Sequence, residues 1–140
     1  MISHYDLYKI ILHRLDPLFK THMNDEQLGG GTTFFPGRMT FDFKCDHNFL
    51  GAYNRIIAER AKGKWIITQT IVDASFKVMG KYIIIEIYDN DSIKLIDTDK
   101  DISAVDRGFM KGLMRDISEF ILKKKGSVDN EIDCIKNSDG

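Results

Sequence analysis

The sequence is poor in cysteine. Its 140 residues include two, Cys45 near the middle and Cys134 close to the C-terminal end, and they do not form a Cys-x-x-Cys pair. Two isolated cysteines cannot make the disulfide framework that holds many small secreted domains together. We therefore expect both thiols to be free and the fold to depend on a hydrophobic core.

Long hydrophobic runs are also missing. The uninterrupted isoleucine run Ile83–Ile85 covers three residues, whereas a transmembrane helix needs about 20 apolar residues. The N-terminal segment carries Asp6 and three histidines, where a signal peptide would have a basic flank and a continuous apolar core. These absences predict a cytoplasmic protein that does not enter a membrane.

No motif of high specificity for catalysis or for a cofactor is present. The serines lie in no Gly-x-Ser-x-Gly elbow, and neither cysteine lies in a motif that would mark it as a nucleophile. The glycines Gly29–Gly31 precede a predicted strand and lack the Lys-Ser or Lys-Thr pair of a nucleotide-binding loop. We therefore expect a protein that is not an enzyme and has no cofactor.

The composition is that of one folded domain. Hydrophobic residues make up 43% of the chain and charged residues 29%, which is typical of a globular protein of this length. We place this domain at residues 1–125. From Gly126 onward Asp, Asn, Ser and Gly prevail without periodicity, which predicts a flexible acidic tail at residues 126–140.

Residues typical of strands are densest between Trp65 and Ile96. Their alternation predicts three antiparallel strands there, with turns at Gly80-Lys81 and at Asn90–Ser92. A turn at Pro36-Gly37 predicts two more strands before them. The expected antiparallel sheet of four to five strands is drawn from the segments Thr32–Phe35, Arg38–Cys45, Trp65–Val78, Tyr82–Tyr88 and Ser92–Ile96.

Three further segments have the one-sided apolar stripe of an amphipathic helix. They cover residues 2–23, where Ser3 and Asp6 form a capping box, residues 46–62 and residues 103–124. We therefore predict the α+β class, with the sheet packed against the N-terminal and C-terminal helices. The middle helix is expected between strands two and three, at an edge of the sheet or across its other face.

Two groups of carboxylates resemble parts of metal sites. Asp97, Asp99 and Asp101 alternate like the start of a calcium loop, but Ile102 and Gly108 stand where an EF-hand has its glycine and its bidentate glutamate. We interpret these acids as residues placed before a helix N-terminus, where the helix dipole favours negative charge.

The second group consists of the strand acids Asp42, Asp73 and Glu86, which a metal-dependent nuclease or hydrolase could use. Tyr88 stands where the common Glu-x-Lys arrangement of nucleases has its lysine. An ion pair with a strand lysine, such as Lys77 or Lys94, explains Glu86 more simply. We therefore predict no metal site.

Charge is uneven along the chain although the net charge is −1. Residues 55–81 carry six basic and two acidic side chains. The last predicted helix carries cations at steps of four, a spacing that can follow a phosphate backbone. Polar faces of helices are charged in most soluble proteins, so the pattern has a structural explanation too. The candidate nucleic-acid-binding residues are Arg55, Arg60, Lys64, Arg107, Lys111 and Arg115.

Three functional hypotheses follow. The first is a small non-enzymatic regulatory protein that binds nucleic acid, or a nucleic-acid-processing enzyme, through the basic helix face. The second is an assembly or adaptor protein that docks on a protein partner through exposed aromatic residues, among them Phe34, Phe35 and Trp65. The third is the metal-dependent nuclease or hydrolase. The lack of an active-site motif favours the first two.

Overall fold

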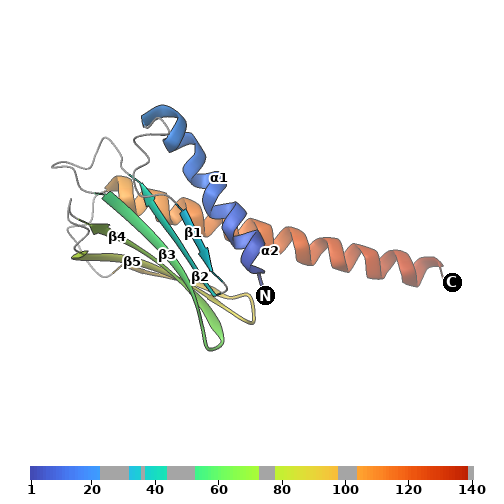
Figure 1. Ribbon diagram of the computed structural model, residues 1–140. Helices are drawn as coiled ribbons and strands as arrows, with labels where there is room; N and C mark the ends of the chain where they lie inside the picture. The colour runs from blue at the N-terminus through green and yellow to red at the C-terminus, as the bar shows by residue number, and fades with distance from the viewer. Residues whose placement is uncertain (23–31, 36, 44–52, 73–77, 98–103, 139–140) are drawn as a thin grey trace.

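Two helices and six strands make up the described part of the chain (Figure 1). The computed structural model describes the backbone of residues 1–22, 32–35, 37–43, 53–72, 78–97 and 104–138, and the side chains of residues 1–15, 37–41, 54–70, 83–97 and 107–126. The elements follow in the order α1 (His4–His22), β1 (Thr32–Phe35), β2 (Arg38–Phe43), β3 (Tyr53–Ala61), β4 (Lys64–Val72), β5 (Val78–Tyr88), β6 (Ile93–Asp97) and α2 (Ala104–Ser138).

The strands form one antiparallel sheet in which spatial order follows chain order, from β1 to β6. Both helices lie on one face of this sheet (Figure 1). The α+β class and the two terminal helices are therefore confirmed. The sheet has one strand more than the largest number expected, because β3 replaces the predicted middle helix.

The predicted helix at residues 46–62 is wrong. Residues 53–61 form β3, while residues 46–52 lie outside the described part of the chain. Asn54, Ile56 and Ala58 are buried in alternation with more exposed neighbours, which is the period of a strand. β3 pairs with β4 along its whole length. A tight turn at Gly63 joins the two strands, and its φ of 78° suits glycine. This pairing outweighs a local apolar pattern that fits a helix equally well.

The strand boundaries after β3 also differ from the prediction. β4 ends at Val72, with a register shift between Thr70 and Val72, and residues 73–77 are outside the described part. The expected turn at Gly80-Lys81 is wrong, because both residues belong to β5. The turn at Asn90–Ser92 is confirmed, and it joins β5 to β6 with Asp91 at a φ of 69°.

The start of α1 agrees with the sequence prediction, whereas α2 is longer than predicted. Ser3 Oγ accepts a hydrogen bond from the Asp6 amide at 3.1 Å, as the N-cap of a capping box does, and it also donates a hydrogen bond to the Asp6 carboxylate at 2.9 Å. α2 continues to Ser138, beyond the expected end at residue 124. The flexibility expected of residues 126–140 stays a prediction. Neither described helix is long and apolar enough to cross a bilayer.

The core lies between the helices and the face of the sheet that they cover, which we call the inner face. Leu7, Ile11 and Leu15 of α1 are fully buried against it, as are Leu113 and Ile117 of α2. The sheet contributes Met39, Phe41, Ile56, Ala58, Trp65, Ile67, Ile83, Ile85 and Ile87. Burial of this apolar surface is what fixes both helices to the sheet.

Candidate binding surface on the helix layer

The outward side of the two helices, which we call the helix layer, is held together by ion pairs between α1 and α2. Lys124 Nζ lies 3.3 Å from Asp6 Oδ2, and Arg14 Nη1 lies 3.4 Å from Asp116 Oδ2. Asp6 and Arg14 are eight residues apart on α1, and their partners Lys124 and Asp116 are eight residues apart on α2 in the reverse order. The two helices are therefore antiparallel neighbours over this region.

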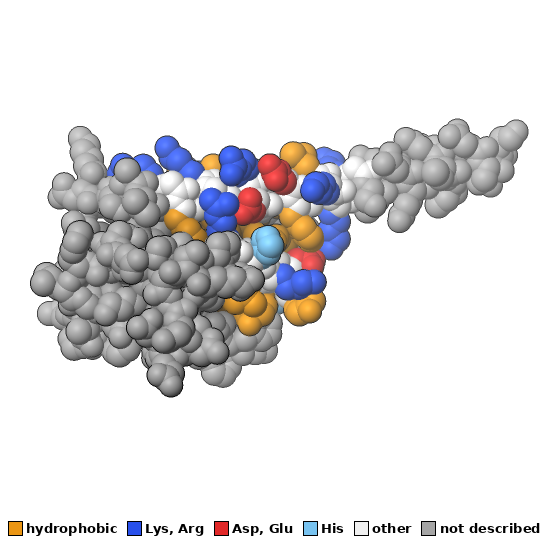
Figure 2. All heavy atoms as spheres, turned by 90° about the horizontal axis from the view of Figure 1, so that it is seen from above, with side chains coloured by type: hydrophobic (Ala, Val, Ile, Leu, Met, Phe, Trp, Pro, Cys, Tyr) orange, Lys and Arg blue, Asp and Glu red, His pale blue; other side chains and the backbone are white. Residues whose placement is uncertain are grey.

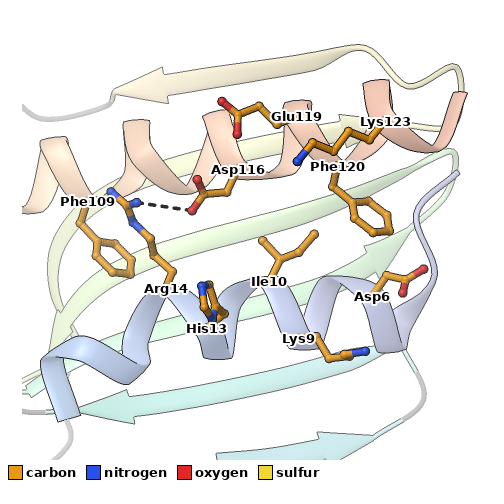
Figure 3. Close-up of a pocket in the computed structure, with 10 residues that line it drawn as sticks. All are labelled: Asp6, Lys9, Ile10, His13, Arg14, Phe109, Asp116, Glu119, Phe120 and Lys123. Atoms are coloured by element: carbon orange, nitrogen blue, oxygen red, sulfur yellow. Dashed lines mark hydrogen bonds and ion pairs between the residues drawn. The ribbon is translucent and has the colours of Figure 1, made fainter. Parts of the chain in front are cut away.

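Arg14 crosses α2 at a glycine. A Cβ atom at Gly112 would lie 1.8 Å from Arg14 Nη2, so that only glycine leaves room for the guanidinium in this position. The same guanidinium lies 5.9 Å from the centre of the Phe109 ring, within the range of a cation–π contact. Figure 3 shows Arg14 reaching from α1 across to Asp116. Arg14 and Gly112 therefore fit together at this point of the helix contact.

A groove of about 900 Å³ runs between the helices on this layer. Its apolar part is made by Ile10, Phe109 and Phe120, of which Ile10 and Phe120 point into the space between the helices in Figure 3. Its charged lining is balanced, because three cations face three carboxylates, with His13 beside them. These are Lys9, Arg14 and Lys123 against Asp6, Asp116 and Glu119.

Of the six candidate nucleic-acid-binding residues, three belong to α2. Lys111 and Arg115 are exposed and pair with no carboxylate in the described part of the chain, and Figure 2 shows Lys and Arg side chains along this helix. Arg107 is half-buried, and its Nε lies 2.5 Å from Asp97 Oδ2. Lys111 and Arg115 are therefore available to a ligand, while Arg107 already has an anionic partner.

The other three candidates lie on the sheet. Arg60 packs at 5.8 Å over the Trp65 ring and pairs with Asp89 at 2.5 Å. Lys64 points to the face without helices, where it pairs with Glu86 on the neighbouring strand. Arg55 faces the same way from β3 and has contacts of its own. The six residues thus lie on opposite sides of the sheet and do not form one continuous surface.

The Lys64–Glu86 pair shifts the pKa of both groups away from their ordinary values. The hydrogen bond from the ammonium of Lys64 lowers the pKa of Glu86, with smaller contributions from Tyr88 and Lys94, against the opposing effect of burial. The same hydrogen bond raises the pKa of Lys64. The sequence had suggested Lys77 or Lys94 as the partner of Glu86; Lys77 lies outside the described residues, and among those described the ion-pair partner is Lys64.

Other exposed cations of the helix layer were not among the sequence candidates. Residues 107–126 of α2 hold six basic and two acidic side chains, a net charge of +4. Lys123 continues the four-residue spacing of Lys111 and Arg115 after Glu119, and Lys125 is exposed beside it. Lys9 adds an exposed cation from α1. The four-residue spacing was the signal that could have identified Lys123.

Of the three acids expected for a hydrolase, the structure describes the side chain of Glu86 and the backbone of Asp42. Asp42 is on β2 and Glu86 on β5, three strand spacings apart, which is about 14 Å. Asp73 lies outside the described residues, and among those described no three potential ligands cluster to hold a metal ion. Strands this far apart do not favour a cation site shared by Asp42 and Glu86.

The adaptor hypothesis expected Phe34, Phe35 and Trp65 to be exposed, and the structure describes the side chain of Trp65. Trp65 is 1% exposed, and its indole donates a hydrogen bond to the backbone carbonyl of Ile2 at 3.3 Å. The expectation that Trp65 is exposed is therefore wrong. The side chains of Phe34 and Phe35 lie outside the described part.

Comparison with known proteins gives no family for this chain. No protein-family model, no curated protein and no solved structure matches it.

Proposed function

We propose that the protein is a non-enzymatic nucleic-acid-binding protein that uses the helix-layer cations Lys9, Lys111, Arg115, Lys123 and Lys125. The net charge of +4 on residues 107–126 carries this proposal, because the whole chain has a net charge of −1. A local excess of exposed cations attracts the phosphate backbone and releases its counterions.

The described contacts explain why these cations, and not all six sequence candidates, carry the proposal. Arg60, Lys64 and Arg107 each pair with a carboxylate of the same chain, which would have to be given up before a phosphate could bind. Lys111 and Arg115 pair with none in the described part. The expected site is thus centred on α2, with Lys9 of α1 at its margin.

A salt titration with a matched charge variant tests this function. Binding of fluorescent duplex and single-stranded DNA is measured by anisotropy at low and at physiological salt. The variant Lys111→Gln/Arg115→Gln should bind more weakly, and the salt slope should fall by about 0.9 for each lost duplex phosphate contact. The control Arg38→Gln/Lys94→Gln removes two exposed cations from the opposite face of the sheet. Equal losses in both variants, or no binding at low salt, would reject the proposal.

The groove between α1 and α2 favours a second function, docking of a helical segment of a protein partner. A balanced set of three cations and three carboxylates around Ile10, Phe109 and Phe120 suits an amphipathic helix better than a polyanion. Peptides selected from a displayed library of amphipathic helices should bind the native chain and fail to bind Ile10→Asp. Selected peptides that bind both proteins equally would show that the groove is not a docking site.

A further inference from the structure

The first turn of α1 is joined to the sheet by a histidine that acts as a hydrogen-bond acceptor. His4 Nε2 accepts a hydrogen bond from the backbone amide of Gly37, in the turn between β1 and β2. Gly37 is held in place from its other side, because its carbonyl accepts a hydrogen bond from the Arg60 amide at 2.8 Å. A backbone amide can only donate, so Nε2 must keep its lone pair. The His4 ring is therefore neutral in this structure, with its proton on Nδ1.

The same ring packs against Trp65. The two ring centres lie 4.6 Å apart and the rings are nearly perpendicular, at 81°. Trp65 is 1% exposed, and its indole donates its hydrogen bond to the carbonyl of Ile2, which is 2% exposed. His4 and Ile2 thus cover Trp65 together, and both belong to the start of the chain.

The charges around this contact do not favour a second cation. The guanidinium of Arg60 lies 5.8 Å from the centre of the Trp65 ring that His4 contacts. The described carboxylates of the elements that meet here already have cationic partners. These ion pairs are Met1–Asp91, Asp6–Lys124, Arg38–Glu59 and Arg60–Asp89. A proton on His4 would therefore add positive charge beside Arg60 and compete with existing pairs.

We propose that His4 is a pH-sensitive latch, whose protonation releases the first turn of α1 from Gly37 and from Trp65. A protonated ring would turn an N–H toward the N–H of Gly37, so that two donors would face each other and the hydrogen bond would be lost. A histidine in water takes up its proton near a pH of about 6.5. The latched state binds one proton fewer than the released state. Its population relative to the released state therefore falls by up to about tenfold for each pH unit below that value.

The release is confined to the start of α1. Leu7, Ile11 and Leu15 keep the rest of the helix on the inner face, where all three are fully buried. What becomes exposed is Trp65 together with Ile2, an apolar surface at one end of the molecule. Acid would thus open this end locally, below the free energy of global unfolding. The latch does not depend on what the helix layer binds.

The fluorescence of Trp65 reports the latch directly, because it is the only tryptophan of the chain. Between about pH 8 and about pH 5.5 the native emission should shift to longer wavelength as the indole meets water, while circular dichroism stays unchanged. His4→Gln should show no such shift, because its amide oxygen accepts a hydrogen bond at any pH. His13→Gln removes an exposed histidine of the same helix and should behave like the native chain. An equal shift in the native chain and in His4→Gln, or no shift in the native chain, would overturn the proposal.

NMR tests the hydrogen bond itself. At about pH 8 the ¹⁵N shifts of the His4 ring should show the proton on Nδ1 and a bare Nε2. The amide signal of Gly37 should then change in parallel with the Trp65 emission as the pH falls. A ring that carries its proton on Nε2 at pH 8, or a Gly37 amide that is unaffected while the ring takes up its proton, would overturn the latch.

Discussion

The two faces of the sheet are built from alternate residues of the same strands, yet they have different chemistry. On β4, Trp65 and Ile67 point to the inner face and are at most 1% exposed, whereas Lys64, Ile66 and Thr68 point to the opposite face, which we call the outer face, and are partly exposed. Isoleucine occurs on both faces. Hydrophobic character alone therefore does not decide which face the helices cover.

The difference lies in where charge is placed. The described charged residues of the inner face, Arg60 and Asp97, lie at strand ends, and its buried polar side chains include Asn54 and Gln69, joined by a hydrogen bond of 3.2 Å. The outer face carries ion pairs among its isoleucines, such as Lys64–Glu86 and Arg38–Glu59. A helix layer packed on those ions would have to remove them from water, which costs more than the pairs return.

The largest expected effect contrasts two consecutive residues of β4. Ile67→Ala, on the inner face, should lower the free energy of unfolding by about 2–5 kcal/mol, because it leaves a cavity in the core. Ile66→Ala, on the outer face, should lower it by about 1 kcal/mol, the range of strand preference at a partly exposed site. Urea unfolding at low micromolar concentration measures both. Equal losses would contradict the assignment of the faces.

The sequence predicted most of this architecture because its strands and helices have clear periods. The turn expected at Gly80-Lys81 was wrong, since both residues lie in β5. The larger error is β3, where Ile56 and Ile57 satisfy the period of a helix and of a strand together. What decides between them is the backbone pairing of β3 with β2 and β4, which joins residues that local patterns do not connect. Long-range pairing of this kind is not contained in a single segment of sequence.

Part of the candidate binding surface was predictable because α2, like the strands, has a clear sequence period. A four-residue spacing correctly marked Lys111 and Arg115 as exposed residues on one side of α2. Nothing in the local sequence indicated that Lys64 pairs with Glu86 or that Arg107 pairs with Asp97, since each pair joins two elements. The α1–α2 groove is likewise lined by residues of two elements far apart in the chain, such as Ile10 and Phe120.

A smaller change in the free energy of unfolding is expected for substitutions at two glycines of α2. Gly108→Ala should stabilise the protein by about 0.5–1 kcal/mol, because a Cβ there meets no other atom and alanine favours the helix. Gly112→Ala gains the same preference but displaces Arg14 from Asp116 and Phe109, contacts worth about 1 kcal/mol together. Gly112→Ala should therefore be the less stable of the two.

A double-mutant cycle separates this displacement from other effects of the substitution. In the background of Arg14→Ala the two glycine substitutions should become nearly equivalent, because the group that clashes with a Cβ at Gly112 is gone. Thermal unfolding of the four variants measures the coupling. A difference between the two glycines that persists without Arg14 would mean that the backbones of α1 and α2 themselves limit the space.

The smallest expected effect is a pH dependence from the outer face. Because the pKa of Glu86 is lowered in the folded chain, its carboxylate stabilises the fold above the unfolded pKa of about 4.3, and this contribution is lost as the pH falls through the folded pKa. The raised pKa of Lys64 affects the stability of the fold at alkaline pH. Its contribution is present below the unfolded value of about 10.4 and is lost as the pH rises through the folded pKa.

Lys64→Met should therefore flatten both limbs of the stability profile relative to the native chain. The control is Lys62→Met, which removes an exposed lysine from the β3–β4 turn that pairs with no carboxylate in the described part. Urea unfolding between acid and alkaline pH measures the three proteins. A partly exposed ion pair contributes little, so the test is the change in slope and not in absolute stability. If both variants follow the native profile in parallel, the Lys64–Glu86 pair does not influence folding.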